Sequence, residues 1–283
     1  MARNDESGEA PQTANGEWQE IENALRLAVE MAMMTADGLD SVVSQQIRTY
    51  PRTEPDPRVS SHSSPYQSRI LSLLQVHFRL QPPDPQEVAN LRDAYRRIHQ
   101  RLTGLSRISF RLVSDGVARR VSGEGRGDTF GYVVGRTLPI FLNETYFGQT
   151  RQNARDSSPR SSPTTRVHGV AGSQLPGSPR GQRAPGPVRG HVEVEQGGVR
   201  ITYSREIRAG VILHETVHVC YGAEGAVHRA IRSGESVASD VEDCSVGYRQ
   251  ITSYTAALND AYVFERFARC VHQAASSQAS SRP

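Results

Sequence analysis

Residues 148–200 form a long stretch in which apolar side chains are scarce, and this stretch limits how the chain can fold. Serine, proline, glycine and arginine dominate it, and eight arginines against one aspartate and two glutamates give it a net charge of +5. Such a segment buries too little apolar surface to offset the entropy lost on ordering. We therefore predict a disordered, solvated insertion that divides one folded domain into residues 17–147 and 201–274.

The two ends of the chain are polar as well. Residues 1–16 and 275–283 show no apolar periodicity, and we predict that both are disordered. The N-terminus has no apolar stretch typical of a signal peptide, and no window approaches the roughly 20 apolar residues that a membrane helix needs. These features predict a protein without a membrane partner, which stays in the cytoplasm or is exported by a route that needs no N-terminal signal peptide.

Helical periodicity marks the beginning of the first folded part. Apolar residues recur at helical spacing from Trp18 to a break at Gly38, and a shorter apolar run follows near 68–78. Asp84 followed by Pro85 is then a typical helix start, and apolar residues continue that helix at the same spacing. We predict that these N-terminal helices supply much of the core.

Alternation with a period of two follows these helices. It predicts a small, mostly antiparallel sheet with strands near 108–112, 129–134 and 138–142. Pro139 is expected at a sheet edge, because proline lacks the N–H that a central strand needs. From Ile201 the pattern is helical again, with helices expected near 204–221, 234–243 and 249–274. The predicted fold class is therefore α+β.

The run His214-Glu215-Thr216-Val217-His218 is the feature that points to a chemistry. Residues four apart lie on one face of a helix, so His214 and His218 can direct two imidazoles at one metal ion. Zn²⁺ is bound by histidine nitrogens and activates water at catalytic sites. Glu215 can then take the proton of the attacking water and pass it to the leaving amine. We predict a zinc metallopeptidase with Glu215 as general base and a peptide or protein as substrate.

A catalytic zinc site needs a third protein ligand, and spacing alone does not choose it. His228 and His272 have no partner at ligand spacing, and we interpret them as ordinary histidines. The downstream carboxylate candidates are Glu224, Glu235, Asp240, Glu242 and Asp243.

The residues around this motif resemble one known family. The run Arg208-Ala209-Gly210-Val211-Ile212-Leu213-His214-Glu215 resembles the active-site helix of the aspzincins, the family of deuterolysin and peptidyl-Lys metalloendopeptidase. An aspartate in a Gly-Thr-x-Asp-x-x-Tyr-Gly run is that family's third zinc ligand. The resemblance assigns this role to Asp243, which Gly247 follows at the family spacing. It implies a zincin-like metallopeptidase domain with a His-Glu-x-x-His zinc helix over residues 18–147 and 201–272.

The resemblance also implies residues that meet the substrate. The family's Asn-Ala-Asp-x-x-Glu-x-Phe run is similar to residues 259–267, which implies that Glu265 lines a pocket for a substrate lysine after the scissile bond. Tyr262 stands where the family has its aspartate. Val246 replaces the tyrosine that stabilises the oxyanion in the family, and Tyr248 nearby is our candidate for that role.

Two alternatives stay open. The first is a catalytically weak or inactive zinc-binding module that acts in protein–protein interaction, which Val246 in place of tyrosine favours. The second is a zincin of another clan in which Glu235 or Asp240 is the third ligand, because a glutamate on a following helix also suits zinc.

Composition adds further expectations. All 33 Lys+Arg residues are arginine. An enzyme that cleaved beside lysine would thereby spare itself, but base-composition bias or selection against ubiquitin acceptors explains the same fact. The basic insertion lacks interleaved aromatic residues, so we expect no nucleic-acid partner, and we expect a monomer. The three cysteines (Cys220, Cys244 and Cys270) are odd in number, which favours reduced thiols over a disulfide framework.

Overall fold

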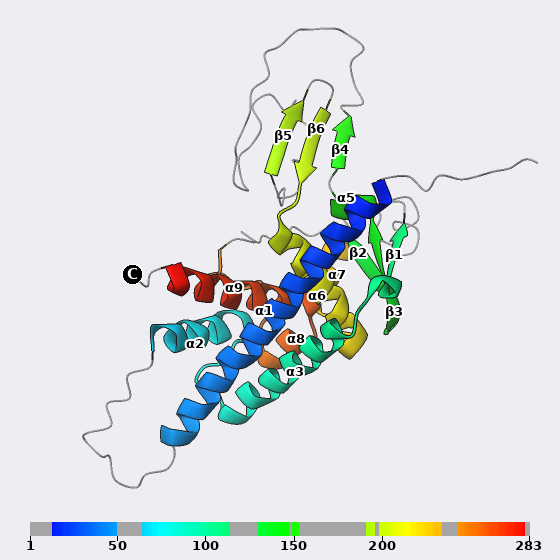
Figure 1. Ribbon diagram of the computed structural model, residues 1–283. Helices are drawn as coiled ribbons and strands as arrows, with labels where there is room; N and C mark the ends of the chain where they lie inside the picture. Colours follow the sequence, from blue (N-terminus) through cyan, green and yellow to red (C-terminus); the bar gives the residue numbers. More distant parts are fainter. Residues whose placement is uncertain are drawn as a thin grey trace, which may run out of the picture.

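The computed structural model describes residues 13–49, 64–113, 130–147, 149–152, 191–195, 198–233 and 243–280. It is an α+β structure in which a body of packed helices carries one small sheet at its side, with a second small sheet beyond it (Figure 1). The helices are α1 (Thr13–Thr49), α2 (Pro65–Phe78), α3 (Pro85–Thr103), the 3-10 turn η1 (Arg107–Ser109), α5 (Glu144–Phe147), α6 (Arg205–Tyr221), α7 (Ala226–Arg232), α8 (Tyr254–Leu258) and α9 (Ala261–Ser280). The strands are β1 (Phe110–Val113), β2 (Gly131–Val134), β3 (Thr137–Asn143), β4 (Gln149–Gln152), β5 (His191–Glu195) and β6 (Gly198–Thr202).

The long helix α1 packs against α3, α6 and α9 (Figure 1). Small residues on its buried face, such as Ala24, Ala28 and Ala32, let those neighbours approach closely. The helix does not break at Gly38 as predicted, but continues to Thr49. A side chain at Gly38 would place its Cβ 2.5 Å from Cδ1 of Ile70 on α2. This glycine therefore allows two helices to come together and does not end one.

The start of α3 confirms the predicted cap. Oδ1 of Asp84 accepts hydrogen bonds from the N–H groups of Gln86 and Glu87, at 2.6 and 3.3 Å. Such caps stabilise a helix by about 1 kcal/mol. Further along α3, the hydroxyl of buried Tyr95 donates to the carbonyl of Phe264, at 2.7 Å. The α3 helix thereby fixes α9, and α9 carries residues of the candidate site described below.

The sheet beside the helices is mixed, with β3 between β1 and β2. The β1 strand pairs with β3 in parallel and β2 pairs with it antiparallel, so the sheet is not mostly antiparallel as predicted. Pro139 lies in the central strand and not at an edge. The β2–β3 register shifts between Tyr132 and Val134, and the β1–β3 register begins only at Ile140. Pro139 thus falls where ladder pairing is interrupted, and its missing N–H costs no hydrogen bond.

A second, antiparallel sheet contains β4, β6 and β5 in that order (Figure 1). These strands occupy both ends of the 148–200 segment, so the prediction of disorder does not hold there. The α9 helix likewise extends to Ser280, into the segment predicted to be a disordered tail, and α1 already begins at Thr13. The helix predicted near 234–243 falls mainly on residues outside those that the structure describes.

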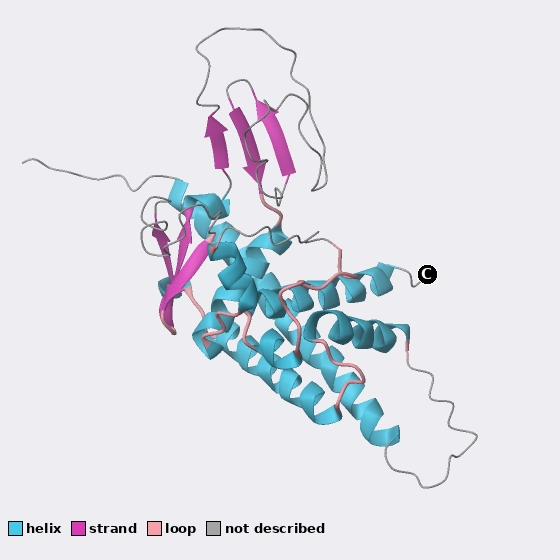
Figure 2. Cartoon of the chain, turned by 180° about the vertical axis from the view of Figure 1, so that it is seen from behind, coloured by secondary structure: helices cyan, strands magenta, loops and turns pink. Residues whose placement is uncertain are grey.

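A disulfide joins Cys244, in the loop before α8, to Cys270 on α9, with a Cα–Cα separation of 5.6 Å. The prediction of reduced thiols was therefore wrong for these two cysteines, and Cys220 is the cysteine left as a thiol. An odd count does not exclude one bridge, and the two partners are 26 residues apart in sequence. Seen from behind, the described helices form one packed body (Figure 2), and none of them is long and apolar enough to cross a membrane.

Candidate metal centre

The α6 helix holds the first two histidines. Its N-cap is Ser204, whose side chain accepts a hydrogen bond from the N–H of Ile207, and an ion pair of 2.7 Å between Arg208 and Glu20 ties the helix to α1. His214 and His218 are one turn apart on this helix and both are buried, at 7% and 8% exposure. The i,i+4 arrangement expected from the sequence is therefore present within a packed helix.

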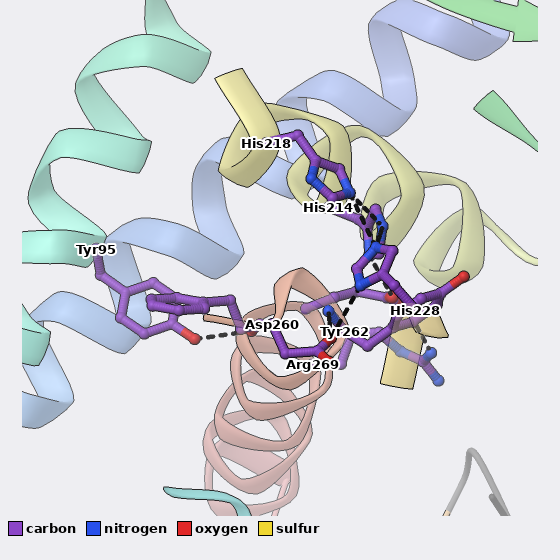
Figure 3. A network of polar contacts seen from close by, with 9 residues as sticks. Tyr95, His214, His218, His228, Asp260, Tyr262 and Arg269 are labelled. Atoms are coloured by element: carbon purple, nitrogen blue, oxygen red, sulfur yellow. Dashed lines mark hydrogen bonds and ion pairs between the residues drawn. The ribbon is translucent and has the colours of Figure 1, made fainter. Parts of the chain in front are cut away.

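A left-handed glycine then turns the chain back. Gly222 ends α6 with φ of +63°, and its N–H donates to the carbonyl of His218 at 2.8 Å. The short α7 follows after a four-residue link that begins with this glycine, and it carries His228, which is 6% exposed. The imidazole of His228 turns toward α6 (Figure 3). Our interpretation of His228 as a histidine without partners was wrong.

The three imidazoles meet through the same ring nitrogen. Nε2 of His214 lies 3.1 Å from Nε2 of His218, and Nε2 of His228 lies 3.2 and 3.0 Å from those two atoms. Each Nε2 is either an N–H donor or a lone-pair acceptor. Among three such atoms at least two are alike, so protein hydrogen bonds alone cannot satisfy every contact. One cation placed among the three lone pairs would satisfy them all.

The surroundings favour the neutral histidines that bind metals. Burial lowers the pKa of His214, although the neighbouring Glu265 opposes this effect. Burial, together with the adjacent His214, lowers the pKa of His218 to about 2. Both rings are therefore neutral at neutral pH. The group can hold a metal ion, since one nitrogen of each ring lies within 4.8 Å of the others.

Two carboxylates lie on the Nδ1 side of the histidines, and Figure 3 shows one of them, Asp260, beside His228. Oδ1 of Asp260 lies 3.2 Å from Nδ1 of His228, and Oε2 of Glu265 lies 3.7 Å from Nδ1 of His214. Oε1 of Glu265 also accepts from Arg269, at 3.3 Å. A carboxylate accepts at Nδ1 only when that nitrogen carries the proton, which leaves the lone pair at Nε2. The carboxylate of Asp260, at 3.2 Å, thus favours the tautomer of His228 that a metal needs, whereas Glu265, at 3.7 Å, is too far from Nδ1 of His214 for a hydrogen bond.

The donor set and its spacing fit zinc. Tetrahedral zinc with Zn–N bonds of about 2.0–2.1 Å holds its nitrogens about 3.3–3.4 Å apart, close to the 3.0–3.2 Å between these atoms. Asp260 is fully buried, and among the described residues its only ion pair is with His228. A buried carboxylate needs a compensating charge, and a dication bound to His228 would provide it.

Asp243 is not part of this group. Its side chain is exposed, and Oδ1 accepts a hydrogen bond of 2.7 Å from the N–H of Ser245. It lines an open pocket of about 420 Å³ that also contains Tyr66 and Arg69. The residue after Asp243, Cys244, forms a disulfide with Cys270 on α9. Cys270 is ten residues after Asp260, which corresponds to roughly 15 Å along a helix. The structure therefore groups His228, and not Asp243, with the two histidines of α6.

The other carboxylate candidates divide into two sets. Glu224 pairs with Arg232 at 2.9 Å and does not belong to the histidine group. Glu235, Asp240 and Glu242 lie outside the residues that the structure describes.

Glu215 and two tyrosines, Tyr262 and Tyr248, lie at different distances from the histidines. Glu215 is buried, at 5% exposure, next to His214 on α6. Tyr262 packs its ring against His214 and His228, with ring centroids 4.3 and 4.6 Å away. Tyr248 is one ring further out, 6.2 Å from Tyr262. The structure thus places Tyr262, and not Tyr248, in direct contact with the imidazoles.

Glu265 has surroundings that differ from the predicted substrate pocket. Its carboxylate is buried, at 5% exposure, between His214 and Arg269. Spacing could have suggested this position, because Glu265 and Arg269 are four apart on α9 and form an i,i+4 pair.

Comparison with known proteins adds no relative to this picture: no family model, curated protein or solved structure matches the chain. The geometry of the histidine group is therefore the main guide to function.

Proposed function

We propose that this protein is a zinc-dependent metalloendopeptidase whose metal is held by His214, His218 and His228. One observation carries the proposal: the three buried Nε2 atoms lie 3.0–3.2 Å from one another, and one of the three histidines, His214, directly precedes Glu215 on α6. Three protein ligands are typical of catalytic zinc sites, which keep a fourth position open, whereas structural sites use four. The resemblance of residues 208–215 to the aspzincin helix supports the same class.

In this proposal Glu215 and the apolar residues of α6 have separate roles beside the bound metal. Bound zinc lowers the pKa of water and polarises the substrate carbonyl. Glu215 accepts the proton of the attacking water as the new C–O bond forms, and returns it to the amine nitrogen when the C–N bond breaks. The surrounding apolar residues of α6 exclude bulk water, which keeps the histidines neutral.

The rival function is a zinc-binding module without catalysis. Val246, at the position of the family's oxyanion tyrosine, is 45% exposed in the structure and supports this rival. Metal content does not separate the two, because both bind zinc. Turnover does.

The test combines metal analysis with peptide cleavage. We expect purified wild type to contain about one zinc per chain, and His228→Ala to lose most of it, while Asp243→Ala keeps it. Glu215→Gln should keep the zinc and the fold but lose cleavage of casein or a peptide library, because it removes the proton acceptor and no ligand. Zinc-loaded wild type that cleaves nothing would leave the binding module, and full zinc retention in His228→Ala would return the third ligand to the carboxylates.

The same peptide library tests the preference for lysine after the scissile bond that the aspzincin resemblance implies. Sites with a basic residue at that position would support it, and a lysine introduced near residue 170 should then be cut by active enzyme. Sites without a basic preference would leave base-composition bias or selection against ubiquitin acceptors as the reason for a chain with arginine and no lysine.

A further inference from the structure

The side of each imidazole that faces away from the metal decides how firmly that ring is held. A histidine bound through Nε2 can still turn about its side-chain bonds, and an acceptor at Nδ1 fixes both its tautomer and its orientation. Asp260 supplies such an acceptor to His228, at 3.2 Å (Figure 3), and the carboxylate of Glu265 faces Nδ1 of His214 at 3.7 Å, an electrostatic contact longer than a hydrogen bond. Both carboxylates come from one stretch of chain, Asp260 and Glu265.

The carboxylate of Asp260 is itself fixed by backbone donors. Oδ2 accepts the N–H of Val227, at 2.7 Å, and Oδ1 accepts the N–H of Tyr262, at 3.2 Å. Val227 directly precedes His228, and Tyr262 is the second residue of α9. The residue after Asp260, Ala261, donates its N–H to the carbonyl of Ala223 at 3.1 Å. One fully buried side chain thus joins the start of α9 to α7 and meets His228 at the same time.

Gly225 makes this approach possible. A Cβ at this position would lie 2.5 Å from Oδ2 of Asp260 and 2.6 Å from the carbonyl oxygen of Asn259. Its φ of −91° is open to any residue. The glycine is therefore required for space and not for backbone conformation, and the space that it leaves contains the carboxylate.

Gly210 plays the matching part for Glu265. It lies one turn before His214 on α6, and its Cβ would be 2.7 Å from Oε1 of Glu265. Glycine inside a helix costs about 1 kcal/mol relative to alanine, so helix propensity does not account for it. The absent side chain lets α9 bring a carboxylate close to Nδ1 of His214.

We propose that Asp260 and Glu265 are positioning residues that hold His228 and His214 in their metal-binding orientation, and that Gly225 and Gly210 are small so that these carboxylates can reach the rings. The proposal rests on the proposed metal site. It gives Glu265 a role toward the ligand histidine and not toward substrate lysine. Asp260 has the larger effect, because its oxygen is nearer to Nδ1 and both of its oxygens are fixed by backbone donors.

The experiment measures zinc affinity by competition with a chromophoric chelator, and the unfolding of the metal-free protein in parallel. We expect Asp260→Asn to lower zinc affinity by about 10- to 100-fold, and Glu265→Gln to lower it by less. Asp84→Asn is the matched control, since Asp84 also accepts two N–H bonds at a helix start but faces no histidine. It should bind zinc as wild type does.

Glycine variants keep the proposal testable if Asp260→Asn does not fold. The atoms nearest to the new Cβ in Gly210→Ala belong to the carboxylate end of Glu265 and to Cδ of Arg269, which are the far ends of long side chains, so the metal-free protein should be as stable as wild type or more so, while zinc affinity falls. Gly104→Ala is its control, because the Cβ there finds its nearest atom at an ordinary 3.5 Å.

The outcomes separate this proposal from the one that it rests on. Wild type that binds no zinc overturns both. Wild type that binds zinc, with Asp260→Asn and Gly210→Ala within twofold of its affinity, overturns the positioning role alone and leaves the metallopeptidase intact. A loss of affinity in Asp260→Asn no greater than that in Asp84→Asn has the same meaning.

Discussion

His77 offers a direct test of how the helical body is packed. Its imidazole is 2% exposed at the end of α2, and the ring meets Phe267 edge-on, with centroids 6.3 Å apart. Neither ring nitrogen makes a hydrogen bond of ordinary geometry. Burial, reinforced by the charge of Arg266, lowers the pKa of His77 to about 3. In an unfolded chain the pKa of histidine is about 6.5.

This difference makes the fold sensitive to acid. As the pH falls below about 6.5, the unfolded chain binds a proton at His77 that the folded chain binds only near pH 3, so the free energy of unfolding decreases across that window. At pH 5 the loss from this residue is about 2 kcal/mol, and above pH 7.5 it is close to zero. His77→Leu removes the titrating group, so its free energy of unfolding should decrease by about 2 kcal/mol less between these pH values.

Urea unfolding of both proteins at about pH 7.5 and about pH 5, in excess chelator, gives four free energies. Their double difference isolates His77, because the other titrating groups cancel. Phe267→Leu is the control: it changes the ring that His77 faces but keeps the imidazole, so its pH dependence should remain that of wild type. A double difference below about 0.5 kcal/mol for His77→Leu would refute the argument from burial.

Two further predictions concern the bonds that fix α9. Cys244→Ser should lower the free energy of unfolding by about 3–4 kcal/mol through the lost constraint on a loop of 26 residues; wild type in reductant should lose as much, Cys220→Ser should be nearly neutral, and equal stability with and without reductant would count against the bridge. Tyr95→Phe should lose about 1 kcal/mol, because it removes the buried hydrogen bond to the carbonyl of Phe264; denaturant unfolding measures this, and a variant as stable as wild type would show that the bond contributes nothing.

Local signals predicted the helices well and their limits poorly. The Asp84-Pro85 start of α3 could be read from the sequence because the cap acts within three residues. Gly38 could not, because its reason for being small is Ile70 on another helix. Pro139 was misplaced for the same kind of reason: whether a strand is central depends on its neighbours, and the interrupted pairing that tolerates this proline appears only in the assembled sheet.

The candidate site likewise contains residues that local spacing predicts and residues that depend on contacts between distant parts of the chain. His214 and His218 follow from helical spacing, which is a local property. His228 follows from Gly222, whose left-handed conformation ends α6, and from the short link that returns α7 to the same histidines. Asp243 was chosen by likeness to a motif, and the disulfide at the next residue holds it far along α9.

A signal for His228 was nevertheless present in the sequence, but only when neighbouring residues are considered together. Gly222, Gly225 and His228 occur within seven residues, which is a turn followed by a histidine, and a turn after a metal-binding helix is the shortest route by which a later ligand can return to it. Asp260 would have completed the pattern as a buried carboxylate before a helix, since a ligand histidine commonly has one at its other nitrogen. The sequence could not supply the distance between Asp260 and His228. That distance depends on Gly225, because any side chain there would displace Asp260 and so change the orientation of His228. The position of the third histidine of the proposed site therefore depends on the contacts of α7 with Asp260 and Tyr262, which the spacing within α6 does not reveal.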